Sequence, residues 1–100
     1  MDTKEAVLKA KLYLQAIGSF LDCEKAFLFG SYLDGKQRED SDIDIALFVK
    51  SIEGNYSSII KKLFRARREV DPRIEPHLFY ENSDSSGFYE EVSRVGIRIQ

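Results

Sequence analysis

The chain has 100 residues, of which 43% are hydrophobic and 32% charged, and its formal net charge is −2. This length is enough for one domain around one hydrophobic core, and the small negative charge excludes recruitment of nucleic acid by overall basicity. With one cysteine, Cys23, and one histidine, His77, the chain can form neither an internal disulfide nor a zinc site of clustered Cys and His ligands.

The first half of the chain predicts a helix followed by two strands. Residues 3–20 predict the helix, because apolar residues recur near a 3.6-residue period at Val7, Leu8, Leu12, Ile17 and Phe20. Residues 26–29 are a short apolar run that stops at Gly30, which is typical of a strand buried on both faces. A polar, turn-rich stretch over residues 30–41 then leads into a second predicted strand, residues 42–49.

A second helix and a third strand are predicted in the middle of the chain. Residues 56–70 carry apolar residues at helical spacing, and the dipeptide Asp71-Pro72 breaks that helix. Residues 73–80 predict the third strand. Pro76 lies within it and favours a sheet edge or a bulge, because proline cannot donate to the strand ladder.

The end of the chain predicts a short helix over residues 88–95, ended by Gly96, and a last strand over residues 97–99. Helices and strands in this order predict an α/β (α+β) domain over residues 1–100, with a small mixed β-sheet flanked by helices. No apolar run approaches the roughly 20 residues of a membrane helix. The charged, amphipathic N-terminus is unlike a signal peptide, so we expect a cytoplasmic protein with no membrane partner.

Three carboxylates occur where strands can bring them together. Asp42 and Asp44 are two residues apart on the second predicted strand, so both side chains point to one face. Neighbouring acids repel each other, so they need basic neighbours or a bound cation, and oxygen ligands favour Mg²⁺. Glu75 completes a three-carboxylate metal site if its strand lies beside that of Asp42. Asp71 is the competing choice, although its position before Pro72 favours a role in ending the helix.

A Gly-Ser pair, Gly30-Ser31, follows the first predicted strand. Glycine lets the backbone approach a ligand closely, and free N–H groups after it favour a phosphate. Ten residues, the last of them Ser41, separate this pair from Asp42-Ile43-Asp44. The arrangement resembles the Gly-Ser-x10-Asp-x-Asp signature of the nucleotidyltransferase (DNA polymerase beta-like) superfamily. The shortness of the chain resembles its minimal nucleotidyltransferases.

The resemblance implies a nucleotidyltransferase fold and a metal-dependent enzyme that transfers a nucleoside monophosphate, AMP from ATP, to an acceptor hydroxyl. Small family members are often antitoxins paired with an all-helical HEPN protein, so the resemblance implies a tyrosine of such a partner as the acceptor. It also implies two Mg²⁺ ions, held by Asp42, Asp44 and Glu75 as catalytic and metal-binding residues, and a nucleotide site that includes Gly30, Ser31 and Ser41.

Two departures from the family pattern are visible. Many minimal members have an arginine soon after the Gly-Ser pair, whereas residues 32–35 here read Tyr-Leu-Asp-Gly, leaving Lys36 or Arg38 to take its place. The third carboxylate is Glu75 instead of the commoner aspartate. These departures favour an alternative function, a catalytically weak or inactive module with the same fold that neutralises its partner by binding. Nucleic acid is not an expected partner.

His77 shares a predicted strand face with Glu75. It could bind a phosphate or orient a metal ligand, but we favour a half-exposed strand histidine at the edge of a cleft. The basic residues of the second predicted helix are interpreted as a solvated face in preference to a docking surface; they are Lys61, Lys62, Arg65 and Arg68.

Overall fold

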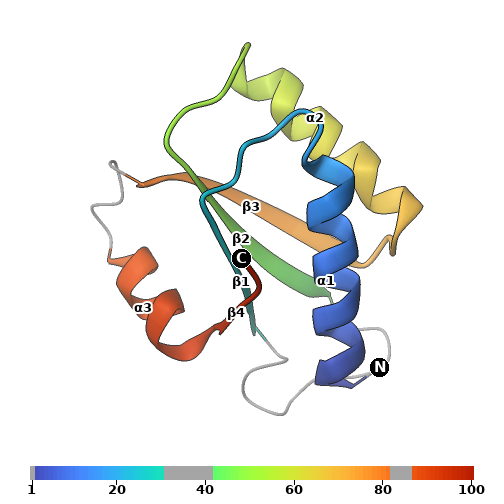
Figure 1. Cartoon of the computed structure of the whole chain (residues 1–100), viewed down its shortest axis with the longest axis vertical. Helices are drawn as coiled ribbons and strands as arrows, with labels where there is room; N and C mark the ends of the chain where they lie inside the picture. The colour runs from blue at the N-terminus through green and yellow to red at the C-terminus, as the bar shows by residue number, and fades with distance from the viewer. Residues whose placement is uncertain (1, 31–41, 82–86) are drawn as a thin grey trace.

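The structure is a computed structural model that describes residues 2–30, 42–81 and 87–100. Within these residues the helices and strands follow the predicted order (Figure 1). None of the described helices is long and apolar enough to cross a membrane. The elements are α1 (Thr3–Ile17), β1 (Lys25–Phe29), β2 (Ile43–Val49), α2 (Tyr56–Ala66), the 3-10 turn η2 (Arg67–Glu69), β3 (Ile74–Tyr80), α3 (Phe88–Val95) and β4 (Ile97–Arg98).

The strands form one mixed sheet in the order β3-β2-β1-β4. β1 pairs antiparallel with β2 and with β4, whereas β2 and β3 are parallel and are connected through α2. The mixed α/β architecture that the sequence predicts is therefore confirmed. β3 is an edge strand, as Pro76 indicates, because an edge position leaves one side of its backbone without a ladder.

The sheet separates two layers, with α1 and α2 on one face and α3 on the other (Figure 1). β2 contributes buried residues to both layers. Its odd-numbered residues, Ile43 to Val49, are fully buried toward α1 and α2, while Ala46 and Phe48 are buried toward α3. A strand buried on both faces needs apolar residues throughout, so the one charged residue inside β2, Asp44, is an exception that requires an explanation.

α1 packs on the sheet through a stripe that differs from the predicted one. The buried residues of the helix are Ala6, Ala10, Tyr13 and Ile17. Leu8 and Leu12, which we expected in the core, are 59% and 45% exposed. The two alanines have small side chains, which let the helix backbone approach the sheet closely, and this favours their stripe over the leucine stripe. α1 also ends at Ile17, earlier than predicted, with Gly18 as its C-cap.

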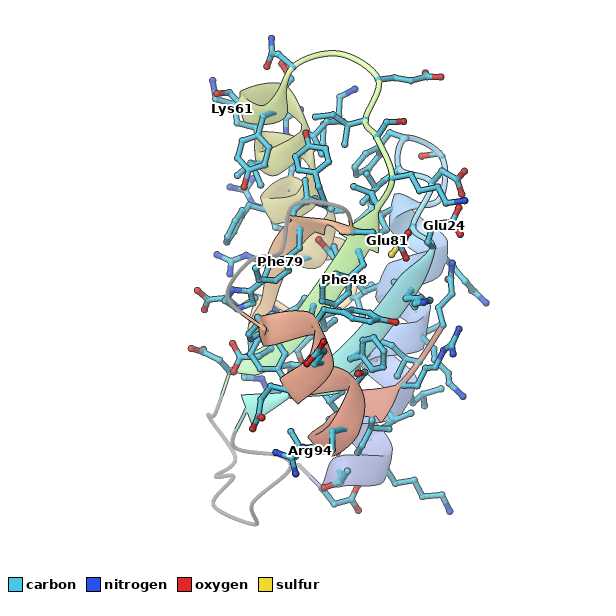
Figure 2. All side chains as sticks on the ribbon, turned by 90° about the vertical axis from the view of Figure 1, so that its left-hand side faces the viewer. Glu24, Phe48, Lys61, Phe79, Glu81 and Arg94 are labelled. Carbon is cyan, nitrogen blue, oxygen red and sulfur yellow. The ribbon has the colours of Figure 1, made fainter. Side chains whose placement is uncertain are left out.

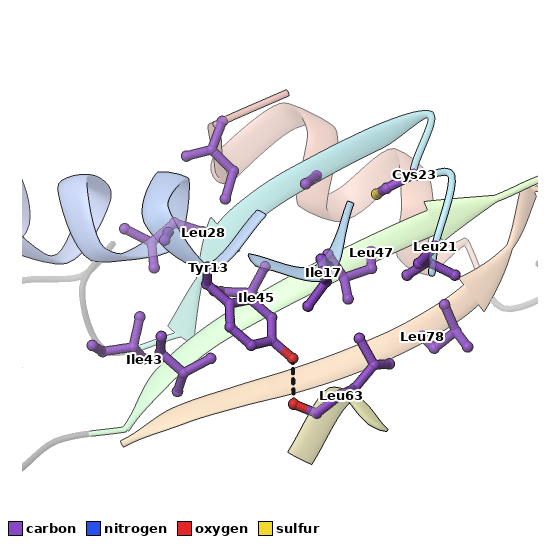
Figure 3. Packing of buried hydrophobic residues seen from close by; sticks show 14 of the residues in the cluster. Tyr13, Ile17, Leu21, Cys23, Leu28, Ile43, Ile45, Leu47, Leu63 and Leu78 are labelled. Carbon is purple, nitrogen blue, oxygen red and sulfur yellow. Dashed lines mark hydrogen bonds between the residues drawn. The ribbon is translucent and has the colours of Figure 1, made fainter. Parts of the chain in front are cut away.

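Tyr13 connects α1 to α2 inside this core. Its hydroxyl is fully buried and donates a hydrogen bond of 2.7 Å to the carbonyl oxygen of Leu63 (Figure 3). Burial raises the pKa of the Tyr13 hydroxyl above its usual range, so this group stays a donor. A buried hydroxyl with a partner avoids the desolvation cost of an unpaired one, and the bond fixes the two helices relative to each other.

The face toward α3 is covered by an aromatic cluster. Its buried residues are Phe27, Ala46, Phe48 and Val92, with Phe29, Phe79, Phe88 and Tyr89 packed around them. The rings of Phe48 and Phe79 are stacked with centroids 5.3 Å apart, and Figure 2 shows both residues close to α3. Phe88 contacts the rings of Phe29, Phe48 and Phe79, so it packs against this cluster.

Candidate active site

Asp44 lies near the start of β2, between the two strands that flank it. Its partner on β1 is Phe29 and its partner on β3 is Glu75. Because paired residues on neighbouring strands share a face, Asp44 and Glu75 are adjacent on the α3 side of the sheet. The Asp44 side chain keeps 25% of its surface exposed. Asp42 is exposed and directly precedes β2. Of the three predicted carboxylates, Asp44 and Glu75 are therefore register partners, and Asp42 lies two residues before Asp44 in the chain.

Gly30 follows β1 and contacts the same carboxylate. Its φ of 86° lies in the left-handed region that glycine adopts at little cost. A Cβ atom built at this position would collide with Oδ2 of Asp44. Two independent constraints therefore require glycine here, the backbone conformation and the space taken by Asp44. The sequence predicts a close approach of the Gly30 backbone to a ligand, which stays a prediction; the group that lies beside Gly30 in the structure is the carboxylate of Asp44.

His77 also reaches Asp44, a contact that the sequence left open only as the less favoured alternative of a histidine that orients a metal ligand. His77 Nε2 lies 3.2 Å from Asp44 Oδ1, and its ring packs edge-on against Phe29 with centroids 5.2 Å apart. Its side chain is 36% exposed, which agrees with the predicted half-exposed histidine. The sequence indicated that Glu75 and His77 share a strand face. The contact with Asp44 depends in addition on the side-chain conformation of His77, whose ring extends toward β2.

The predicted nucleotide-binding residues Ser31 and Ser41 lie outside the described residues, as do Lys36 and Arg38. Within the part of the chain that the structure describes, no three Asp, Glu, His or Cys side chains are gathered closely enough to hold a metal ion. Asp42, Asp44 and Glu75 therefore do not form a preformed three-carboxylate cluster. Carboxylates repel one another, so their oxygens converge only where a cation compensates the charge.

Asp71, the competing choice, has a structural role. Its side chain is 5% exposed and accepts hydrogen bonds of 2.6 Å from both Lys9 Nζ and Arg73 Nη2. Hydrogen bonding by the Arg73 guanidinium is the main cause that holds the pKa of this carboxyl below its usual range. Through Lys9 and Arg73, Asp71 connects α1 to the segment before β3. Both of its carboxylate oxygens accept hydrogen bonds, so neither is free for a metal ion.

The groups around Asp44 are compatible with a hard divalent cation. Asp44 and Glu75 supply carboxylate oxygens from adjacent strands, and Asp42 supplies a third from the residue before β2. Such ligands suit Mg²⁺, which binds through one or two carboxylates and substrate phosphates. Because Gly30 has no Cβ, the Asp44 carboxylate can occupy the place beside the Gly30 backbone.

The described part of the chain is thus a mixed sheet with Asp44 near the start of β2, beside Gly30 and in register with Glu75. The sequence profile described as "Polymerase beta, Nucleotidyltransferase" matches residues 14–99. The chain therefore belongs to the polymerase beta nucleotidyltransferase family, which confirms the resemblance drawn from the motif, and it is a nucleotidyltransferase enzyme.

Individual proteins are similar to this chain over most of its length. A protein of Methanocaldococcus jannaschii, provisionally named a protein adenylyltransferase, is 31% identical over 78 residues, which cover 76% of this chain and 78% of that protein. A crystal structure of a toxin–antitoxin complex with AMP-PNP contains a chain of similar fold, with a TM-score of 0.60, 24% identity, and coverage of 92% of this chain and 72% of that one.

A second solved structure shows the same fold in another source. It is provisionally named a nucleotidyltransferase from Sulfolobus solfataricus, and it matches with a TM-score of 0.58 and 22% identity. The match covers 94% of this chain and 77% of that one.

Proposed function

We propose that this nucleotidyltransferase is a metal-dependent protein adenylyltransferase, which transfers AMP from ATP to a hydroxyl group of a partner protein. The observation that carries the proposal is the position of Asp44, a half-buried carboxylate in an otherwise apolar strand, in register with Glu75 and in contact with Gly30. The name of the 31% identical relative supports a protein as acceptor and AMP as the transferred group.

In this proposal Asp42, Asp44 and Glu75 hold the metal ions, two in number, as the family resemblance implies. Bound divalent cations supply neutralisation of the triphosphate charge and orientation of the reacting oxygens. The turn after β1 binds the phosphates, with Gly30 allowing the backbone to approach and Ser31 and Ser41 adding hydroxyl donors. Glu75 accepts the proton of the acceptor hydroxyl, whose oxygen bonds to the α-phosphorus as the bond to the leaving pyrophosphate breaks.

We further propose that the acceptor is a tyrosine of an all-helical, HEPN-family toxin and that the chain acts as its antitoxin. The support is the similarity of fold to chains from toxin–antitoxin crystals, one of them with AMP-PNP and another a mutant of the pair MntA–HpeT, which matches with a TM-score of 0.57. The AMP-PNP complex supports an adenine nucleotide as the donor.

The test is label transfer. The protein is incubated with Mg²⁺ and α-³²P-labelled ATP, with and without the protein encoded by the neighbouring gene. We expect label on the neighbour and, by mass spectrometry, an AMP adduct on one of its tyrosines. Removing Mg²⁺ with EDTA should abolish transfer. The double variant Asp42→Asn plus Asp44→Asn should lose transfer by at least about 100-fold, because it removes two anionic ligands.

Asp22→Asn is the matched control, because Asp22 is an exposed aspartate outside the predicted site and its change should leave transfer intact. Persistent label transfer by the double variant would show that the catalytic carboxylates are elsewhere. A wild-type protein that labels nothing yet binds and silences its neighbour would instead support neutralisation by contact alone.

A further inference from the structure

His77 occupies a position on β3 from which it can reach Asp44 diagonally. Its register partner on β2 is Ala46. The Ala46–His77 pair lies on the same face of the sheet as the Asp44–Glu75 pair, two residues further along both strands. Ala46 is fully buried, and its side chain is a single methyl group. The imidazole of His77 can therefore extend over Ala46 toward Asp44. The result is the separation of 3.2 Å between Nε2 and Oδ1.

The direction of this hydrogen bond follows from the chemistry of the two groups. An ionised carboxylate can only accept, so His77 Nε2 carries the hydrogen and donates it to Asp44. The ring is itself restrained by Phe29, whose own ring contacts Phe88 of α3 with centroids 5.5 Å apart. His77 is therefore held from behind by the aromatic cluster.

The two oxygens of Asp44 have different neighbours. Oδ1 lies against His77 Nε2, and Oδ2 lies against the backbone of Gly30. Aspartate has a rotatable carboxylate, and a free one would sample many orientations at an entropic cost when a ligand fixes it. Contacts on both sides remove that freedom before any ligand arrives. Hydrogen bonds of this kind to ligating carboxylates typically affect metal affinity strongly.

We propose that His77 is a positioning residue, whose Nε2–H hydrogen bond fixes the Asp44 carboxylate in the orientation in which that carboxylate binds a divalent cation. The inference rests on the proposed function, since it takes Asp44 as a metal ligand. It assigns His77 no contact with the nucleotide and no transfer of a proton.

Two substitutions separate the hydrogen bond from the packing of the ring. His77→Phe keeps an aromatic ring against Phe29 but removes the donor. His77→Gln loses the ring but keeps an N–H donor at a similar distance from the backbone. The probe is Mn²⁺ alone, without nucleotide, and its dissociation constant is measured by electron paramagnetic resonance for the wild type, both His77 variants and Asp44→Asn.

We expect His77→Phe to weaken Mn²⁺ binding by about 10-fold or more and His77→Gln to bind nearly as the wild type does. In label transfer, raising the Mg²⁺ concentration should recover the activity of His77→Phe, because a positioning defect weakens binding without removing a ligand. Circular dichroism and urea unfolding of each variant confirm that the fold is kept.

The outcomes distinguish two kinds of failure. If Asp44→Asn loses Mn²⁺ binding but His77→Phe does not, the role of His77 is overturned while the proposed site stands. Loss of Mn²⁺ binding in His77→Gln but not in His77→Phe would assign the effect to the ring and overturn the hydrogen bond. If Asp44→Asn binds Mn²⁺ as the wild type does, the metal site is elsewhere and both proposals fail.

Discussion

At the scale of single residues, the site depends on how closely Gly30 and Asp44 approach each other. A Cβ at Gly30 would meet the end of the Asp44 side chain, not a backbone atom. The end of a side chain can rotate away at modest cost, so added bulk at position 30 should displace the carboxylate more than it disturbs the fold. Stability and function should therefore respond differently to the same substitution.

Gly30→Ala and Gly54→Ala test this difference as a matched pair. Both glycines have a positive φ, 86° and 85°, but a Cβ at Gly54 would have no neighbour within 4 Å. Each change should cost about 1 kcal/mol in free energy of unfolding from backbone strain. We expect label transfer and Mn²⁺ affinity to fall about 10-fold or more in Gly30→Ala alone. Urea unfolding and the transfer assay provide the measurements, and equal activity of the two variants would show that the contact with Asp44 is unimportant.

The residues of the site were predictable to different degrees. The spacing of Gly30 and Asp44 is visible in the sequence because both ends of the motif lie in or beside predicted strands. The pairing of Asp44 with Glu75 requires that β2 and β3 be neighbours, which a strand–helix–strand connection favours. The contact of His77 with Asp44 was not predictable, since it depends on a side-chain rotamer and on the space above Ala46.

At the scale of helices and strands, local patterns predicted which elements exist, and packing decided where their faces and ends lie. α3 has the predicted bounds, 88–95, because Gly87 and Gly96 limit it on both sides. For α1 the prediction was right for Ile17, which is buried, and for Val7 and Phe20, which pack against the core, but wrong for Leu8 and Leu12. The helix sequence offers two apolar stripes, and periodicity alone cannot rank them. α2 ends at Ala66, earlier than predicted, because the chain tightens into η2 before Asp71.

Asp71→Asn tests how this junction is held. The carboxylate is buried and bound to Lys9 and Arg73, so its neutralisation leaves two cations without their anion. We expect a loss of about 3 kcal/mol in free energy of unfolding at pH 7 by urea denaturation, with transfer activity per folded molecule unchanged. Asp22→Asn, an exposed change, should stay within about 0.5 kcal/mol of the wild type.

The effect of Asp71 should also depend on pH in a defined direction. Hydrogen bonding by Arg73 lowers the pKa of Asp71 in the folded state, so its stabilisation is complete above the unfolded value of about 3.9 and is lost as pH falls below it. The gap in unfolding free energy between the wild type and Asp71→Asn should therefore narrow from pH 5 to pH 3. A gap that stays constant over this range would contradict the assigned cause.

At the scale of the whole molecule, the sheet separates a large core from a small one. The α1 and α2 face contains most of the buried apolar residues, whereas α3 buries Val92 alone among its own residues. α3 also begins at Gly87 without a side-chain cap, while Asp2 caps α1 and Asn55 caps α2. Fewer buried contacts and a missing cap both lower the free energy of local opening. The candidate site lies on the weaker face.

This asymmetry predicts a hydrogen-exchange pattern that the proposed site should modify. Without ligand, amides of α3 should exchange faster than those of α1 and α2, measured by mass spectrometry of peptic fragments. Mg²⁺ with a non-hydrolysable ATP analogue should slow exchange in α3 and at the start of β3, because binding beside Asp44 restrains Phe29 and, through it, Phe88. Exchange in α1 should change little.

The variant Asp42→Asn plus Asp44→Asn should show the same basal pattern without the ligand effect. Protection confined to α1 and α2 would place the nucleotide on the opposite face of the sheet and rule out the site built around Asp44.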